Sequence, residues 1–253
     1  MKNPGREALA YQKIGNYIAI DLAAVSGEET AAIRVALDLA DLCERIAWDE
    51  QIRVVLLGFD GCMNEGLRAD LLQTDNGEAN SVVKTIAKLR QPVIAAIRGD
   101  AMGLGLELAL ACDIRIGVEN ARFGLPQIRE GRTPSDGGTQ RLPRLIGRGR
   151  AMQMILSGDP IHADEACRLG LINRIVAPEA LMNAATELAR ELAEKSPVSL
   201  SYVKEALYRG MDLTLDQGIG LELDLYLHLF TTADRTEGIA AYKEKRKPKF
   251  EGA

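Results

Sequence analysis

The chain has 253 residues, of which 47% are hydrophobic and only 4% aromatic. This length suits one domain of ordinary to large size, or a core with an appendage, filled mainly by Ala, Leu, Ile and Val. The formal net charge of −5 argues against a general binder of nucleic acid or of anionic membranes.

The N-terminal part of the chain alternates between short apolar runs and segments with helical spacing. A short apolar run predicts a buried strand, whereas apolar residues three or four positions apart predict an amphipathic helix. We expect strands over 17–25, 52–59 and 92–97, helices over 31–48 and 79–90, and a polar loop over 60–78.

The rest of the chain becomes increasingly helical. Beyond a glycine turn at Gly103 and an apolar helix that carries Glu107, we expect strands over 113–117 and 171–176, an extended piece near Phe123, and helices over 138–146, 148–157 and 163–169. The C-terminal part reads as helices broken at Pro197, Gly210 and Gly218. This order predicts an α/β core over 1–195 and a helical extension over 196–253. The apolar residues of the extension indicate that it packs within the subunit or against another.

Cysteine and histidine are too few and too scattered for a metal site or a catalytic triad. The four cysteines lie far apart, at Cys43, Cys62, Cys112 and Cys167. They show no CxxC spacing, so we expect free buried thiols in a reducing compartment. His162 and His228 are the only histidines. The N-terminus lacks the apolar segment of a secretion signal and no apolar run reaches a membrane span, which favours a cytoplasmic protein.

Two segments in the middle of the chain place a carboxylate beside a glycine-rich turn. Gly103 and Gly105 flank Leu104, and an apolar helix with Glu107 follows. Asp136 stands in the turn sequence Pro-Ser-Asp-Gly-Gly. N–H groups at the start of a helix can hold a negatively charged oxygen while a nearby acid handles a proton. The alternative for both carboxylates is a simple helix-capping role.

Several separate motifs follow one another between residues 52 and 176. They read PVIAAIRG, AMGLGLELALACDIRI, FGLPQI and GGTQRLPRLIGRGRAMQMILSGDPIHADEACRLGLINRIV, with a further match, EGIAAYKEKRKPKF, near the C-terminus. This order resembles the enoyl-CoA hydratase/isomerase, or crotonase, family. The resemblance implies a crotonase-like spiral of ββα units with a helical C-terminal trimerisation region. It further implies a coenzyme A thioester as substrate, no metal or redox cofactor, and a homotrimer or dimer of trimers.

The resemblance also implies an oxyanion hole built from two backbone N–H groups. The donors at the matching positions are Leu104 and Leu67, which would hold the thioester oxygen while it carries enolate charge. One such donor can be worth about 3 kcal/mol of barrier. The family usually has an Ala-Gly-Ala-Asp run at the second position, whereas this chain reads Asn-Glu-Gly-Leu-Arg over 64–68. A backbone donor tolerates such changes of side chain.

The acid/base residues implied by the resemblance differ from those of a plain hydratase. Glu107 matches the first of two glutamates that hydratases use, but the second position is Gln127. An amide exchanges no proton, although it can hold water or a substrate oxygen. Asp136 offers a replacement acid and resembles the aspartate of dienoyl-CoA isomerases, dihydroxynaphthoyl-CoA synthases and ring-opening isomerases. This combination favours a dienoyl or cyclic enoyl thioester over a simple straight-chain substrate.

Tyr242 and Lys245 match positions where a neighbouring subunit closes over the coenzyme A nucleotide. The Asn-Arg-Pro loop that the family usually carries after its first strand is absent, because residues 23–27 read Ala-Ala-Val-Ser-Gly. The resemblance therefore implies no coenzyme A contacts for residues 23–27.

Three classes of function remain open from the sequence. Glu107 favours water addition or removal, whereas Gln127 with Asp136 favours movement of a double bond, and we rank hydration narrowly first. A protein that binds a coenzyme A ester without turnover is the second class, supported by Gln127 and the altered 64–68 segment. Nucleic-acid binding by the basic C-terminal cluster is the third, and the acidic total argues against it.

Overall fold

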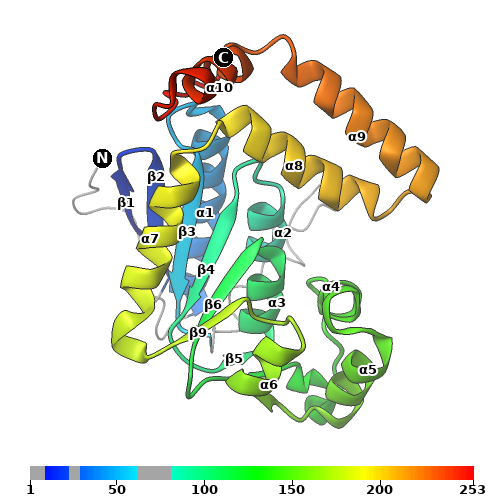
Figure 1. Cartoon of the computed structure of the whole chain (residues 1–253). Helices are drawn as coiled ribbons and strands as arrows, with labels where there is room; N and C mark the ends of the chain where they lie inside the picture. The colour runs from blue at the N-terminus through cyan, green and yellow to red at the C-terminus, as the bar shows by residue number, and fades with distance from the viewer. Residues whose placement is uncertain (1–8, 23–28, 62–80) are drawn as a thin grey trace.

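The computed structural model describes residues 9–22, 29–61 and 81–253, with the backbone alone for 29–33 (Figure 1). The strands are β1 (Ala10–Ile14), β2 (Tyr17–Asp21), β3 (Val54–Phe59), β4 (Val93–Ile97), β5 (Ala101–Met102), β6 (Ile114–Val118), β7 (Arg122–Gly124), β8 (Ile161–His162) and β9 (Arg174–Val176). The helices are α1 (Glu29–Trp48), α2 (Val82–Ala87), α3 (Leu104–Ala111), α4 (Gly138–Ile146), α5 (Arg148–Ser157), α6 (Ala163–Arg168), α7 (Leu181–Ala193), α8 (Pro197–Gly210), α9 (Leu215–Leu229) and α10 (Ala233–Glu244), with short 3₁₀ turns η2 (Pro126–Glu130) and η3 (Pro178–Ala180).

A six-stranded sheet with the order β1-β2-β3-β4-β6-β9 forms the centre of the molecule, and β5, β7 and β8 form a small second sheet. Only β1 pairs antiparallel in the large sheet. Every residue of β3 and β4 is buried, as expected for parallel strands covered on both faces. Figure 1 shows α7 across one face of this sheet and α1 behind it. The predicted α/β core is therefore confirmed.

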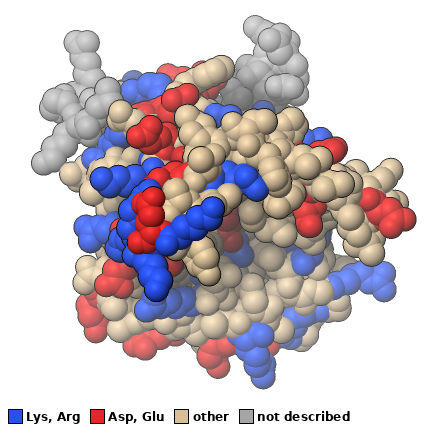
Figure 2. Space-filling view, turned by 45° about the horizontal axis from the view of Figure 1, so that its top comes forward, with Lys and Arg blue, Asp and Glu red and all other residues tan. Residues whose placement is uncertain are grey.

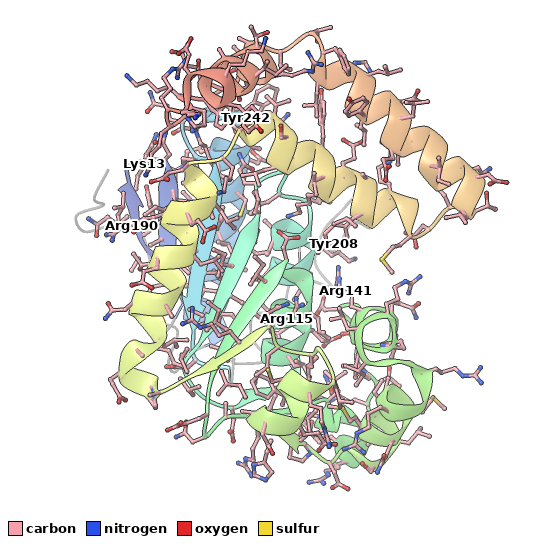
Figure 3. The ribbon with its side chains drawn as sticks, viewed as in Figure 1. Lys13, Arg115, Arg141, Arg190, Tyr208 and Tyr242 are labelled. Carbon is pink, nitrogen blue, oxygen red and sulfur yellow. The ribbon has the colours of Figure 1, made fainter. Side chains whose placement is uncertain are left out.

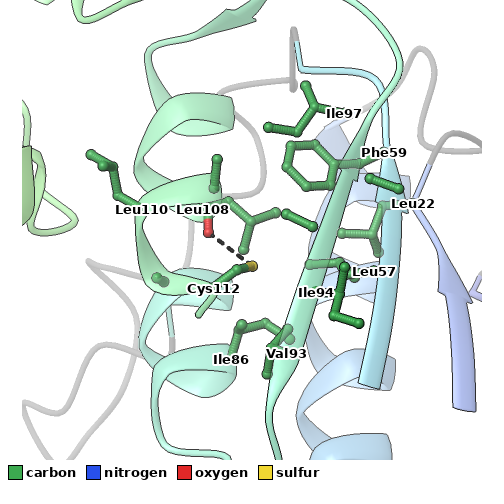
Figure 4. Packing of buried hydrophobic residues seen from close by; sticks show 14 of the residues in the cluster. Leu22, Leu57, Phe59, Ile86, Val93, Ile94, Ile97, Leu108, Leu110 and Cys112 are labelled. Atoms are coloured by element: carbon green, nitrogen blue, oxygen red, sulfur yellow. Dashed lines mark hydrogen bonds between the residues drawn. The ribbon is translucent and has the colours of Figure 1, made fainter. Parts of the chain in front are cut away.

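The core beside α3 is built from large aliphatic side chains. Figure 4 shows Ile94 and Ile97 of β4, with Phe59 of β3, packed against Leu108 of α3. Cys112 closes this cluster and donates its thiol proton to the Leu108 carbonyl oxygen. Buried aliphatic groups contribute roughly 1.5–3 kcal/mol each, so this layer fixes α3 firmly on the sheet.

The described cysteines agree only partly with the expectation of buried thiols. Cys43 and Cys112 are buried, and this burial raises the pKa of each thiol to about 12. Such thiols are almost wholly protonated at neutral pH and are poor nucleophiles. Cys167 is only half-buried, and Cys62 lies outside the described residues.

Two details of the secondary structure differ from the sequence prediction. Gly218 breaks no helix, because α9 runs through it after a capping box formed by Thr214 and Gln217. Gly218 lies beside Gly210 of α8, whose carbonyl oxygen would be 3.5 Å from an added Cβ, an ordinary van der Waals contact, so the packing of α9 on α8 does not require glycine at this position. The second difference is β1, which the sequence analysis missed and which forms a hairpin with β2. No helix in the described part of the chain is long and apolar enough to cross a bilayer, and the cytoplasmic location stays a prediction.

The C-terminal helices are attached to the core by a charged contact from α8. Figure 1 shows α8 and α9 side by side, extending away from the sheet. The Lys204 ammonium group lies 2.7 Å from the Asp113 carboxylate and donates to the Gln91 carbonyl oxygen at 3.0 Å. The Asp113 carboxylate also accepts the N–H of Val93, at the start of β4. Because the Lys204 and Asp113 side chains are only 12% and 16% exposed, water screens this pair weakly.

We expect Lys204→Met to lower the free energy of unfolding by about 1–3 kcal/mol, since it leaves a half-buried carboxylate without its cation. Urea unfolding followed by circular dichroism measures the change. Lys195→Met is the matched control, because that lysine lies 3.8 Å from Glu191 and both side chains are more than half exposed. Equal stability of the two variants would contradict the importance of the Lys204 contact.

Candidate active site

Glu107 is a buried acid on a helix that is otherwise apolar. All residues of α3 are buried, and Glu107 is 0% exposed. Gly103 caps the helix with a φ of 55°, a left-handed backbone that L side chains rarely adopt. At Gly105 an added Cβ would lie 1.6 Å from the Gly61 carbonyl oxygen. The glycines of the GLG turn are thus required by backbone geometry, and they fix where Glu107 stands.

Three hydrogen bonds converge on the Glu107 carboxylate. Its Oε1 accepts the N–H of Asp136 at 2.7 Å and the N–H of Gly138 at 3.0 Å. Its Oε2 accepts the side-chain amide of Gln127 at 3.3 Å. The structure therefore brings together Glu107, Gln127 and Asp136, which the sequence analysis selected from three separate motifs.

These contacts determine the electrostatics of the carboxylate. An N–H donor stabilises the ionised form of a carboxyl group more than the protonated form. The donors Asp136 and Gly138 also lie at the start of α4, where the helix dipole favours negative charge. Glu107 thus serves as the anion at the N-terminus of α4, a helix other than its own. This geometry suits a group that accepts a proton, because the three donors stabilise the carboxylate form against the cost of its burial.

Asp136 and Gln127 complete the polar part of the site. Both are about 2% exposed. Gln127 Oε1 is buried and accepts no hydrogen bond from the described residues, so it can receive a donor from a ligand. The Gly138 N–H, one of the donors that begin α4, is bound by Glu107, so Glu107 supplies a capping interaction that the sequence analysis considered for Asp136.

One of the two expected oxyanion donors can be located. Leu104 is the first residue of α3, and its N–H finds no acceptor among the residues described. A free N–H at the start of a helix is a suitable donor for a developing oxyanion. Leu67, the second expected donor, lies outside the described residues.

The residues expected to hold coenzyme A lie away from these carboxylates within one chain. Figure 3 shows Tyr242 at the α10 end of the molecule, far from Arg141 on α4. Tyr242 is 86% exposed, and Lys245 ends α10 with a left-handed φ of 54°. One chain does not bring these residues to the Glu107 site. Their contact with coenzyme A stays a prediction.

The sequence analysis missed two residues of this site. Gly138 supplies a donor to Glu107, and an added Cβ there would lie 3.0 Å from Glu107 Oε1. Arg141 donates from Nη1 to the Asp136 carbonyl oxygen at 2.7 Å. The signal was present in the sequence, since two glycines directly follow Asp136 and an arginine stands five positions after it.

Comparison with known proteins finds relatives over most of the chain. Residues 36–253 match the family model described as enoyl-CoA hydratase/isomerase. A short-chain-enoyl-CoA hydratase of Clostridium acetobutylicum is 45% identical over 66% of this chain, and the match spans 64% of that relative's length. An (E)-benzylidenesuccinyl-CoA hydratase of Thauera aromatica is 38% identical over 85% of this chain and 88% of its own length.

A solved structure agrees in fold over almost the whole chain. The enoyl-CoA hydratase of Bacillus anthracis has a TM-score of 0.84 at 32% identity, covering 98% of this chain and 100% of its own. The crotonase-like fold with its helical C-terminal region is thereby confirmed. The chain belongs to the enoyl-CoA hydratase/isomerase family.

Proposed function

We propose that the protein adds water to, or removes it from, a conjugated C=C bond of an enoyl- or dienoyl-CoA thioester, cyclic esters included. The observation that carries this proposal is the buried Glu107 carboxylate, held by two backbone N–H groups and the Gln127 amide beside Asp136. Family membership supports a thioester substrate, and both relatives described above are named hydratases.

In the hydration direction, Glu107 takes a proton from water while the water oxygen bonds to the β-carbon. The electron pair of the C=C bond moves onto the thioester oxygen, which the N–H groups of Leu104 and Leu67 stabilise. Asp136, in its acid form, then donates a proton to the α-carbon or to a more distant conjugated carbon. Gln127 Oε1 accepts the second hydrogen of the water and so orients it. No cofactor takes part, because the thioester itself acidifies the neighbouring carbons.

Bond movement without water is the second candidate function. It uses the same groups, with Glu107 removing a proton from one carbon and Asp136 returning one to another. The presence of Gln127 at the second glutamate position favours it. Binding of the ester without turnover is a third outcome, and one experiment separates all three.

We expect product that carries heavy oxygen when enoyl- and dienoyl-CoA esters are incubated in heavy-oxygen water and analysed by mass spectrometry. Glu107→Gln and Asp136→Asn should each lower the rate by about 100-fold or more, as general acid/base loss does. Asp159→Asn is the control, because that exposed carboxylate pairs with Arg129 on the surface. A shifted double bond at unchanged mass would identify an isomerase. Tight binding without any change of the ester would identify a binding protein.

A carboxyl group introduced at residue 127 tests whether Glu107 is the base whose ionisation sets the acidic limb of the pH profile. In Gln127→Glu a second carboxyl group would lie about 3.3 Å from Glu107 Oε2, and two carboxyl groups so close cannot both ionise readily. The pair keeps a proton to higher pH, so the acidic limb of the pH profile of kcat/KM should move to higher pH. Gln127→Met, which removes the amide donor to Glu107 without adding charge, should lower kcat and move that limb in the same direction by a smaller amount. Identical pH profiles for Gln127→Glu and the parent protein would contradict this arrangement.

We further propose that residues 196–253 form an oligomerisation region and that the protein is a homotrimer or a dimer of trimers. Large apolar side chains on α8, α9 and the connection between them are strongly exposed: Val203, Leu207, Met211, Leu213, Leu215, Ile219, Leu223, Leu227 and Phe230. Figure 2 shows a broad area of uncharged residues beside a cluster of blue and red side chains. Large apolar side chains exposed together on neighbouring helices mark association surfaces. A neighbouring chain would then bring Tyr242 and Lys245 to the coenzyme A of an adjacent site.

Light scattering after size exclusion tests the assembly. The parent chain is expected at three or six times its own mass, and the double variant Leu207→Glu, Leu223→Glu at the mass of one chain, because each glutamate would be buried at the contact. Arg190→Glu on α7 serves as a control, since Figure 3 places Arg190 away from α8 and α9. A monomeric parent chain would contradict the proposal.

A further inference from the structure

The turn before α4 carries both backbone donors of the Glu107 site. Its central residue, Gly137, has a left-handed φ of 94°. The N–H groups of Asp136 and Gly138, on either side, point to the same Glu107 oxygen. The Gly137 carbonyl oxygen faces the other way and accepts the N–H groups of Gln140 and Arg141. The direction of the two donors therefore depends on how firmly this turn is held.

The Arg141 guanidinium group lies directly on this turn. Nη1 donates to the Asp136 carbonyl oxygen at 2.7 Å. An added Cβ at Gly137 would lie only 2.3 Å from Nη1 and 3.0 Å from Cζ, which places the guanidinium group over the bare Cα of the glycine. Figure 3 shows Arg141 on the side of α4 that faces α8. The backbone of Asp136 is thus held at both ends, by Glu107 at its N–H and by Arg141 at its carbonyl.

We propose that Arg141 is a positioning residue, which fixes the Asp136–Gly138 turn so that its two N–H groups hold the Glu107 carboxylate in place. The proposal rests on the function above, in which Glu107 exchanges a proton with water or substrate. A charged donor to a partly buried carbonyl is stronger than a neutral one. When the turn is held in this way, the Asp136 and Gly138 N–H groups stay directed at Glu107, and the turn need not reorganise during the reaction.

Arg144 provides a natural comparison on the same helix. It lies one turn further along α4, donates to the Gln140 carbonyl oxygen at 2.9 Å and reaches Asp212 at 3.4 Å. Its side chain is 51% exposed, and these contacts do not include the turn that holds Glu107. Both arginines stabilise α4 locally, but only Arg141 is connected to the carboxylate. A purely structural role would make the two substitutions equivalent.

The experiment compares Arg141→Met, Arg141→Lys and Arg144→Met in the full-length protein. For Arg141→Met we expect kcat to fall by about 10-fold to 100-fold, as a small misplacement of a catalytic group does, with KM changed by less than about threefold. Arg141→Lys, which keeps a cationic donor, should recover part of the loss. Arg144→Met should match the parent protein. Circular dichroism and thermal unfolding check that each variant folds.

A second readout does not depend on turnover. Hydrogen–deuterium exchange of the peptide that contains residues 134–142 should speed up in Arg141→Met and stay unchanged in Arg144→Met, because only the first loosens the Asp136 and Gly138 amides. If no thioester is turned over, the proposed function fails while the exchange result still decides the role of Arg141. Unchanged kcat and exchange in Arg141→Met, or equal effects of the two methionine variants, would overturn the proposal.

Discussion

A buried carboxylate on an apolar helix is the constraint around which this site is organised. An isolated charge in such a place would cost many kcal/mol, so the surroundings must supply donors. In this protein the Glu107 carboxylate receives them from Asp136, Gly138 and Gln127. Because two of the three belong to the backbone, α4 must begin where α3 places its acid. The Glu107 carboxylate thus links α3 to the start of α4.

The same constraint explains why particular positions carry glycine. An added Cβ at Gly138 would lie 3.0 Å from Glu107 Oε1 and 2.9 Å from the Pro134 Cβ, so the carboxylate could not approach the amides closely. On the opposite side, Gly105 allows α3 to pass within contact of the Gly61 backbone. The Gly61 and Gly103 turns follow the carboxyl ends of the parallel strands β3 and β4. Ligands of open α/β sheets bind at this edge. The position of the Glu107 carboxylate therefore depends both on the strands that carry these turns and on the glycines within them.

Much of this could be predicted from the sequence, and the exceptions have physical causes. Apolar runs predicted β3 and β4 because both are buried on two faces. The half-exposed β1 has no such run, although Gly15 and Asn16 between two short segments are a recognised hairpin signal. The break expected at Gly218 failed because one glycine costs only roughly 1 kcal/mol in a helix, and α9 begins with a capping box and lies along α8. The motifs selected Glu107, Gln127 and Asp136, but no pattern in the sequence indicates which of their atoms form hydrogen bonds.

The glutamine at position 127 is consistent with a single negative charge, on Glu107, at this point of the site. A second glutamate there would set two carboxyl groups about 3.3 Å apart, and one of them would have to hold a proton. The amide removes that competition and gives Glu107 another donor, so a single anion remains at this point of the site. In the proposed reaction the proton donor is therefore a different residue, and the candidate is the buried Asp136, whose N–H binds Glu107. In the proposed reaction the base and the acid act on different carbons of the substrate, as the proposed conjugated ester requires.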